Sequence, residues 1–161
     1  MLPDYEIVLG RGIGTLIFGM TKEEIVEIIG TPDEVDKPYD IEGCNWEIYE
    51  YNFLKCSFSF DPDNEDRLVQ ISIENETFHL LHKIRIGVKK EDILKFGEEL
   101  NFGKYVLEDM RSEEDPTHEL ISYNKVGVNL WLDDGKISSI QILPLFNNEG
   151  LPIWPENLDT N

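Results

Sequence analysis

Histidines and cysteines are the residues of this 161-residue chain that could hold a transition metal. His79 and His82 are three positions apart, a spacing that can bring two imidazoles together on a helix. No third ligand follows at a diagnostic spacing, and Cys44 and Cys56 lack the Cys-x-x-Cys pattern of zinc sites. We therefore expect no metal site, and we interpret the two histidines as part of a linker or an exposed surface.

A glycine-rich stretch over residues 10–14 (GRGIG) has some of the residues of a phosphate-binding loop. A dinucleotide-binding loop needs the spacing Gly-x-Gly-x-x-Gly and a helix that begins directly behind it. Here Thr15 occupies the sixth position, and the first helix signal comes only at Thr21. The pattern therefore predicts a glycine turn.

The acidic segment 61–66 (DPDNED) resembles the beginning of a calcium-binding loop. Such a loop has Gly at its sixth position and Glu at its twelfth, where this chain has Asp66 and Ser72. We interpret the segment as a solvated hairpin tip, with weak adventitious calcium binding as the alternative. No Ser/His/Asp or Cys/His signature is present either. We expect no catalytic residues, no cofactor and no enzyme activity.

The composition is strongly acidic, with 33 Asp and Glu against 14 Lys and Arg, a formal net charge of −19 at pH 7. Such a chain has few cations for phosphates, which argues against direct binding of nucleic acid or of an anionic membrane surface. The first residues show no secretory signal, and no apolar run approaches the roughly 20 residues of a membrane span. We expect a cytoplasmic protein with reduced cysteines and no membrane contact.

The strongest pattern is an internal repeat. Residues 18–30 (FGMTKEEIVEIIG) match residues 86–97 (IGVKKEDILKFG), and each segment has the apolar spacing of a helix. Chance could produce one such match, but it would not readily produce a helix and three strands in the same order. The matches downstream are 47–52 with 119–124, 54–61 with 126–133, and 68–73 with 137–142.

These elements predict an α+β fold of two tandem helix-plus-antiparallel-sheet repeats, with the helices on one face of the sheets. A unit of roughly 70 residues buries little core, so we expect the repeats to form one compact body. The sequence does not decide whether the two sheets join or only abut. The predicted elements are repeat one over 1–80 (helix about 21–30, strands about 46–52, 54–60 and 67–74), repeat two over 81–146 (helix about 89–97, strands about 118–124, 126–132 and 137–143), and an extended C-terminal tail over 147–161 with Trp154 docked on the body.

Residues 12–25 (GIGTLIFGMTKEEI), with the stop signal Gly30-Thr31-Pro32, resemble the helix motif of SmpA/OmlA-type small bacterial proteins. The doubled arrangement over most of 12–145 resembles the β-lactamase inhibitor protein fold. The resemblance implies helix-plus-sheet repeats that present a concave sheet surface to a protein target. Known roles within this fold are protein inhibitors, envelope-assembly lipoproteins, and cytoplasmic immunity proteins of bacterial toxin systems. The chain differs from the lipoproteins, because it lacks a signal and a cysteine at its start.

If the helices cover one side of the sheets, the other side is available to a partner. Tyr and Trp are enriched at binding hot spots, because they combine a large area with a hydrogen-bonding tip. The alternative is that the long loops, the tail or a dimer partner cover these rings. The candidate partner-binding residues are Glu47, Tyr49, Tyr51, Glu119, Tyr123 and Trp131 on the strands, and Asp61, Asp63, Glu65 and Asp66 in the acidic turn.

The charge favours a basic protein as the partner, because opposite charge speeds encounter. We predict a cytoplasmic immunity protein that neutralises a cognate bacterial toxin, a basic nuclease domain, by occluding its active site or substrate surface. The alternatives are an envelope-assembly or scaffold protein of the SmpA/OmlA type, and a non-catalytic inhibitor of another enzyme. A further alternative is a small-ligand module or enzyme that uses Glu47, Glu119 and His118 in a cleft between the repeats. The oligomeric state is left open.

Overall fold

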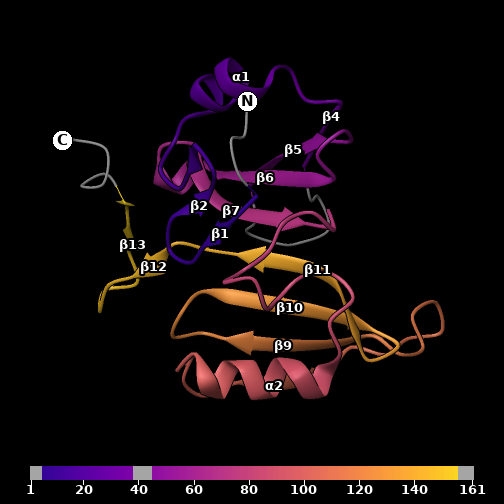
Figure 1. Cartoon of the computed structure of the whole chain (residues 1–161). Helices are drawn as coiled ribbons and strands as arrows, with labels where there is room; N and C mark the ends of the chain where they lie inside the picture. The colour runs from indigo at the N-terminus through magenta and orange to yellow at the C-terminus, as the bar shows by residue number, and fades with distance from the viewer. Residues whose placement is uncertain (1–4, 38–44, 156–161) are drawn as a thin grey trace.

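A computed structural model describes residues 5–37 and 45–155, and its main element is one eight-stranded antiparallel sheet (Figure 1). The strand order across the sheet is β4-β5-β6-β7-β11-β10-β9-β8. Apolar and polar residues alternate along the central strands, which gives the sheet one apolar face. The strands are β4 (Glu34–Asp36), β5 (Glu47–Tyr51), β6 (Cys56–Asp61), β7 (Arg67–Ile73), β8 (Val106–Asp109), β9 (Glu119–Tyr123), β10 (Val128–Asp133) and β11 (Lys136–Ile142).

The predicted α+β fold of two tandem helix-plus-sheet repeats is wrong, because the two halves share a single sheet in a mostly β body. β7 pairs with β11, with Ser72 opposite Gln141 at the centre of the junction. Each of these apolar strands would otherwise expose an unpaired edge, and their pairing satisfies the main-chain hydrogen bonds of both. The matched segments of the sequence therefore take mirror positions in one sheet, since the strand order runs forward in the first half and backward in the second.

The described residues contain two α-helices, α1 (Lys22–Ile29) and α2 (Lys90–Glu99), and one 3₁₀ turn (Pro62–Asn64). Thr21 and Glu24 form a capping box at the start of α1, with each side chain bound to the other residue's backbone N–H. Lys89 provides no side-chain cap for α2. Neither helix is long and apolar enough to cross a membrane.

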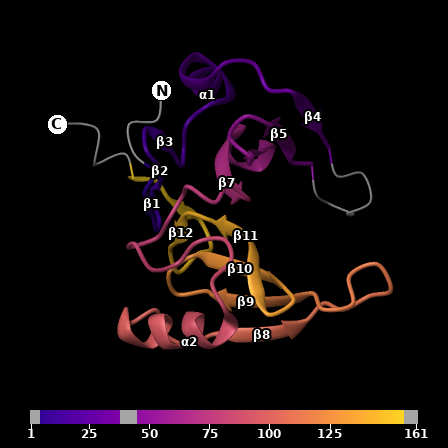
Figure 2. The same cartoon turned by 45° about the vertical axis from the view of Figure 1, so that its right-hand side comes forward.

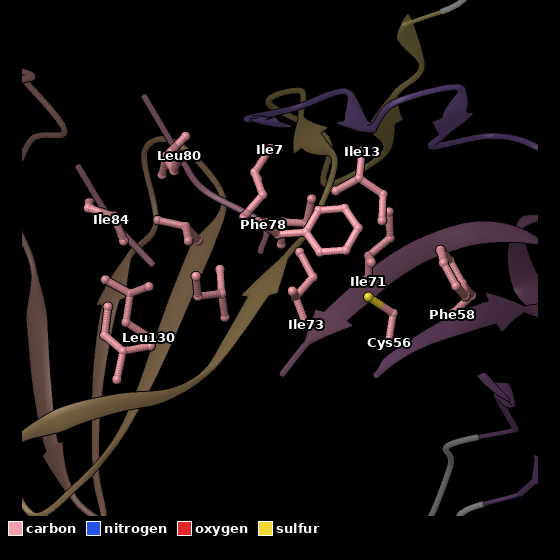
Figure 3. Close-up of a cluster of buried hydrophobic side chains, with 14 of the residues drawn as sticks. Ile7, Ile13, Cys56, Phe58, Ile71, Ile73, Phe78, Leu80, Ile84 and Leu130 are labelled. Atoms are coloured by element: carbon pink, nitrogen blue, oxygen red, sulfur yellow. The ribbon is translucent and has the colours of Figure 1, made fainter. Parts of the chain in front are cut away.

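The apolar face is covered by more than the two helices. A small three-stranded sheet near the N-terminus and the connector 74–89 between the halves also pack on it. Figure 3 shows Phe78 of the connector between Ile7 and Ile13 of the small sheet and Ile71 and Ile73 of β7. The strands of the small sheet are β1 (Ile7–Val8), β2 (Gly12–Ile13) and β3 (Leu16–Ile17).

The C-terminal segment forms a short antiparallel pair, β12 (Leu145–Phe146) with β13 (Pro152–Ile153). Trp154 follows this pair, packs against the hydrophobic core and lies against Gly19. The predicted tail 147–161 is thus described only as far as residue 155. The two outermost strands of the main sheet, β4 and β8, lie between the predicted helix and the first predicted strand of each half, where no strand was predicted.

Candidate functional site

The small N-terminal sheet, the connector and both helices share one core with the apolar side of the main sheet. We call the other side of the main sheet the open face. Directly paired residues of antiparallel strands point to the same side, so the register assigns the residues of this face. They are Glu34 and Asp36 of β4, Ile48 and Glu50 of β5, Ser57, Ser59 and Asp61 of β6, Arg67, Gln70 and Ser72 of β7, Lys136, Ser139 and Gln141 of β11, Asn129, Trp131 and Asp133 of β10, Leu120 and Ser122 of β9, and Val106 and Glu108 of β8.

One row of the open face crosses the whole sheet and is polar over most of its length. At its centre, Asn129 Nδ2 donates to Gln141 Oε1 over 3.0 Å, and Gln141 Nε2 donates to Ser72 Oγ over 3.4 Å. Amides and hydroxyls both donate and accept, so the half-buried members of the row can exchange water for the polar groups of a partner, whereas Ser122 is buried. From β4 to β8 the row is Glu34, Glu50, Ser57, Ser72, Gln141, Asn129, Ser122 and Val106.

Carboxylates lie at both edges of the open face. Glu34, Asp36 and Glu50 lie together at the β4 edge, and Glu108 lies at the β8 edge. The pKa of Glu50 is raised, first by its partial burial and then by the neighbouring Asp36. At the ends of the central strands the register places Lys136 opposite Asp133 and Arg67 opposite Asp61 on this side. Each of these cations faces a carboxylate, so the negative potential is concentrated at the β4 and β8 edges.

Trp131 is the large aromatic residue of the open face, and it is half-buried. Its ring stacks on the ring of His118, with 5.2 Å between the centroids and 13° between the planes. His118 Nδ1 lies 3.0 Å from Asp133 Oδ1, which holds the imidazole in place. Hydrogen bonds from Ser138 first, and from His118, lower the pKa of Asp133. Trp131 is therefore a preorganised aromatic surface of the kind that anchors protein interfaces.

A shallow hollow of about 290 Å³ opens beside the turn between β5 and β6. Its lining includes Glu50, Ser57 and Ser72 of the polar row together with Glu74 and Lys55. The hollow thus combines carboxylates and hydroxyls with one ammonium group. It can receive a polar side chain of a partner that lies on the open face.

The structure places Tyr49, Tyr51 and Tyr123 on the covered face, which corrects their assignment to the partner-binding side. They stand opposite Phe58, Cys56 and Val128, whose side chains are buried. Tyr51 OH donates to Gly30 O over 2.7 Å, and burial raises the pKa of Tyr51 to about 12. Tyr123 is 1% exposed, and its OH has no hydrogen-bond partner among the described residues.

Glu47 and Glu119 also stand on the covered side, at mirror positions of the two halves. Glu47 lies 3.0 Å from Lys22 Nζ, and Glu119 lies 3.0 Å from Lys90 Nζ. Lys22, and Lys37 to a smaller extent, lower the pKa of Glu47. Each carboxylate connects a strand of its half to the first residue of the helix in that half. Both carboxylates are therefore paired with lysines of the same chain.

Asp61 is the last residue of β6, and the acidic residues Asp63, Glu65 and Asp66 lie in the turn between β6 and β7. Asp61 accepts hydrogen bonds from the backbone N–H of Asp63 and the amide of Asn64, as a capping residue of a short 3₁₀ turn does. Asp66 lies 3.6 Å from Lys22, and Glu65 lies 3.6 Å from Arg67. The structure therefore places the turn near the start of α1, and of the four carboxylates the register assigns Asp61 to the open side.

The remaining candidates for metal binding or reactivity are the two neighbouring histidines and the buried cysteine. The rings of His79 and His82 stack with centroids 4.3 Å apart, so they present ring faces to each other and not two nitrogen lone pairs. Burial raises the pKa of the Cys56 thiol to about 12, which keeps it protonated and unreactive. Within the described residues no group of three or more His, Cys, Asp or Glu could hold a metal ion. Cys44 lies outside the described residues.

The two buried tyrosines give a matched test of their environments. Tyr51→Phe removes the hydrogen bond to Gly30 O and is expected to lower the free energy of unfolding by about 1 kcal/mol. Tyr123→Phe removes a hydroxyl without a partner, so it is expected to leave stability unchanged or to raise it by up to about 1 kcal/mol. Urea denaturation of both variants measures the difference. Equal losses in the two variants would contradict the assigned environments.

No protein-family model matches the chain, and no curated protein matches it. Two solved structures were found. One is an extracellular protein containing a SCP domain from Bacillus anthracis str. Ames, at 14% identity and a TM-score of 0.47, covering 78% of this chain and 43% of the other. The second is a DUF4309 family protein (YjgB) from Bacillus subtilis subsp. subtilis str. 168, at 13% identity and a TM-score of 0.49, covering 84% of this chain and 88% of the other. This chain thus spans less than half of the first protein, and neither likeness establishes a shared function.

Proposed function

We propose that this protein is a non-catalytic inhibitor that neutralises a basic toxin domain by placing the open face of its sheet over the toxin's active site or substrate surface. The observation that carries the proposal is the composition of that face. The charged strand residues at its two edges are carboxylates, and its central row offers hydrogen-bonding groups across the sheet.

Charge selects the class of partner. A chain with a net charge of −19 repels acidic proteins at long range and attracts basic ones. Toxin domains that cleave nucleic acids carry cations where the phosphates bind. Carboxylates such as Glu34, Asp36 and Glu50 can stand in for phosphates at such a surface.

The aromatic and polar residues of the open face supply the short-range part of the proposed interaction. Trp131 offers a rigid ring held on His118, which costs little conformational entropy on binding. The half-buried amides of Asn129 and Gln141 can bind main-chain groups of the partner. The role that the sequence resemblance implies for such an inhibitor is that of a cytoplasmic immunity protein, which protects the cell that makes it.

Co-expression tests this function directly. A candidate toxin domain, taken from a gene next to the one that encodes this chain, is expressed in bacteria with and without the protein, and growth is measured. We expect growth only in the presence of the protein, and we expect the purified complex to associate more slowly as the salt concentration rises. Equal killing with and without the protein would reject the toxin assignment.

Matched variants test the surface. Trp131→Ala is expected to weaken the complex by about thirtyfold, the effect of losing a hot spot of about 2 kcal/mol. Glu50→Lys should slow association, because it reverses a charge on the open face. Glu27→Lys makes the same charge change on an exposed position of α1 and serves as the control. An identical loss for Glu27→Lys and Glu50→Lys would show that only net charge matters and would remove the open face from the proposal.

A further inference from the structure

A second surface lies at the edge of the sheet formed by β8. β8 ends the strand order, so β9 is its sole strand partner in the described part of the chain. Apolar side chains are exposed along and beside it: Tyr105 at 48%, Val106 at 47%, Leu107 at 44% and Met110 at 37%. The opposite edge, β4, has carboxylates at two of its three positions. Charge is a usual protection of a free edge, and the first half of β8 lacks it.

The main chain of β8 offers hydrogen-bonding groups on its free side. Met110 donates its backbone N–H to His118 O, in the same register as the β8–β9 pairing. Alternate residues of a strand turn their main-chain groups to opposite sides. The N–H and C=O groups of Leu107 and Asp109 therefore point away from β9, where an added strand could pair with them.

A cavity of about 640 Å³ opens beside the start of this strand, between it and the end of α2. Leu94 and Gly97 of α2, Tyr105 and Tyr123 contribute apolar and aromatic walls, and Glu98 and Lys104 are polar lining residues. Tyr123 is one of these lining residues, and its buried OH has no hydrogen-bond partner within residues 5–37 and 45–155. Figure 2 shows α2 and β8 at the same end of the molecule.

The mirror position in the first half is closed by hydrogen bonds. There α1 ends at Ile29, Tyr51 OH binds Gly30 O, and the carboxylate of Asp33 binds the backbone N–H of Asn52. In the second half the helix continues to Glu99, and Gly97 O accepts from the backbone N–H of Phe102, so it is already engaged. Hydrogen bonds therefore close this position in the first half. In the second half the longer helix leaves an open cavity there, next to the free edge of β8.

We propose that this edge groove binds an extended segment of a partner protein, which pairs with β8 and inserts an apolar or aromatic side chain between Leu94, Tyr105 and Tyr123. The net charge of −19 opposes a second copy of this chain as the occupant and favours a segment with net positive charge. Glu108 of β8 and Glu98 of α2 are the nearby carboxylates that would attract such a segment. This site goes beyond the proposed function, because it does not use the centre of the open face.

Peptide selection tests the groove without knowledge of the natural partner. A phage library of random 12-residue peptides is selected on the immobilised full chain, and enriched peptides are synthesised for affinity measurement. We expect peptides with net positive charge and apolar residues at alternate positions. Their affinity should fall at least about tenfold for Leu107→Pro, which removes an N–H that points away from the β8–β9 ladder, and for Tyr105→Ala, which removes a wall of the cavity.

Leu107→Val keeps the main-chain N–H and should retain binding, and Trp131→Ala should leave it unchanged. Failure to enrich any peptide, or equal affinity for Leu107→Pro and the unaltered chain, would overturn the proposal. Sedimentation equilibrium provides the remaining outcome: a dimer that Leu107→Pro converts to monomer would make a second copy the occupant and would reject a partner segment. None of these results depends on toxin neutralisation, so the two proposals fail separately.

Discussion

Replacing Phe78 with Ala is expected to lower the free energy of unfolding by about 3–5 kcal/mol, the usual cost of removing a buried aromatic side chain. Phe78 is fully buried in the connector between the two halves. Its ring meets that of Tyr5 edge to face at 5.0 Å, and Figure 3 shows it between the N-terminal sheet and β7. Its loss leaves a cavity where segments of both halves meet. Domains of this size are stable by about 5–15 kcal/mol, so the variant is expected to approach the limit of folding.

Phe78→Leu and Phe53→Ala are the controls for this prediction. Leu keeps much of the buried volume and should cost clearly less than Ala. Phe53 lies in the turn between β5 and β6 and is 69% exposed, so its replacement by Ala should change stability by no more than about 0.5 kcal/mol. Urea denaturation followed by Trp fluorescence gives all three values. A cost below about 1 kcal/mol for Phe78→Ala would contradict the central packing position of its ring.

The sequence predicted the elements whose signals are local. The capping box of Thr21 and Glu24 marks the start of α1, and strict alternation marks β6 and β10. The sequence did not show that β7 and β11 pair, because a free strand edge offers the same main-chain groups to any neighbouring strand. The two-residue strands β1 to β3 are too short to have a period, so their contribution to the core could not be recognised. A run such as Tyr105-Val106-Leu107 did contain a strand signal, in its β-branched and aromatic residues.

The candidate site was predicted in part, and the errors have a common cause. Trp131 and the polar residues of β6, β7, β10 and β11 follow from alternation, because each of these strands has one clearly apolar side. β5 mixes charged and aromatic residues, so its faces are decided by register with β6. That register places Tyr49 against the ring of Phe60, at 4.9 Å between centroids. The aromatic character of these residues therefore assigned too many of them to the open face, and the acidic β4 edge was missed because its strand has only three residues.

The glycine-rich stretch near the N-terminus leads to the second large effect, in Gly12→Ala. A Cβ at Gly12 would lie 2.1 Å from Leu16 O and 3.0 Å from Ile17 Cα, both parts of the neighbouring backbone. Its φ of 142° also lies in a region that other residues rarely adopt. The contact should cost about 1–3 kcal/mol and the conformation about 1–2 kcal/mol more, so we expect a total loss of about 2–5 kcal/mol.

Gly30→Ala separates these two contributions. Gly30 has a φ of 89°, and a Cβ there would meet nothing within 4 Å, so this variant should show only the conformational cost of about 1–2 kcal/mol. A larger loss for Gly12→Ala is expected because the turn holds Ile13 and Leu16, both fully buried, against the main sheet. Equal losses for the two variants in urea denaturation would mean that the backbone contact at Gly12 relaxes freely. The unequal result would assign the glycine pattern at 10–14 to close packing of the N-terminal sheet, since a phosphate-binding loop would require no such contact with Leu16 O.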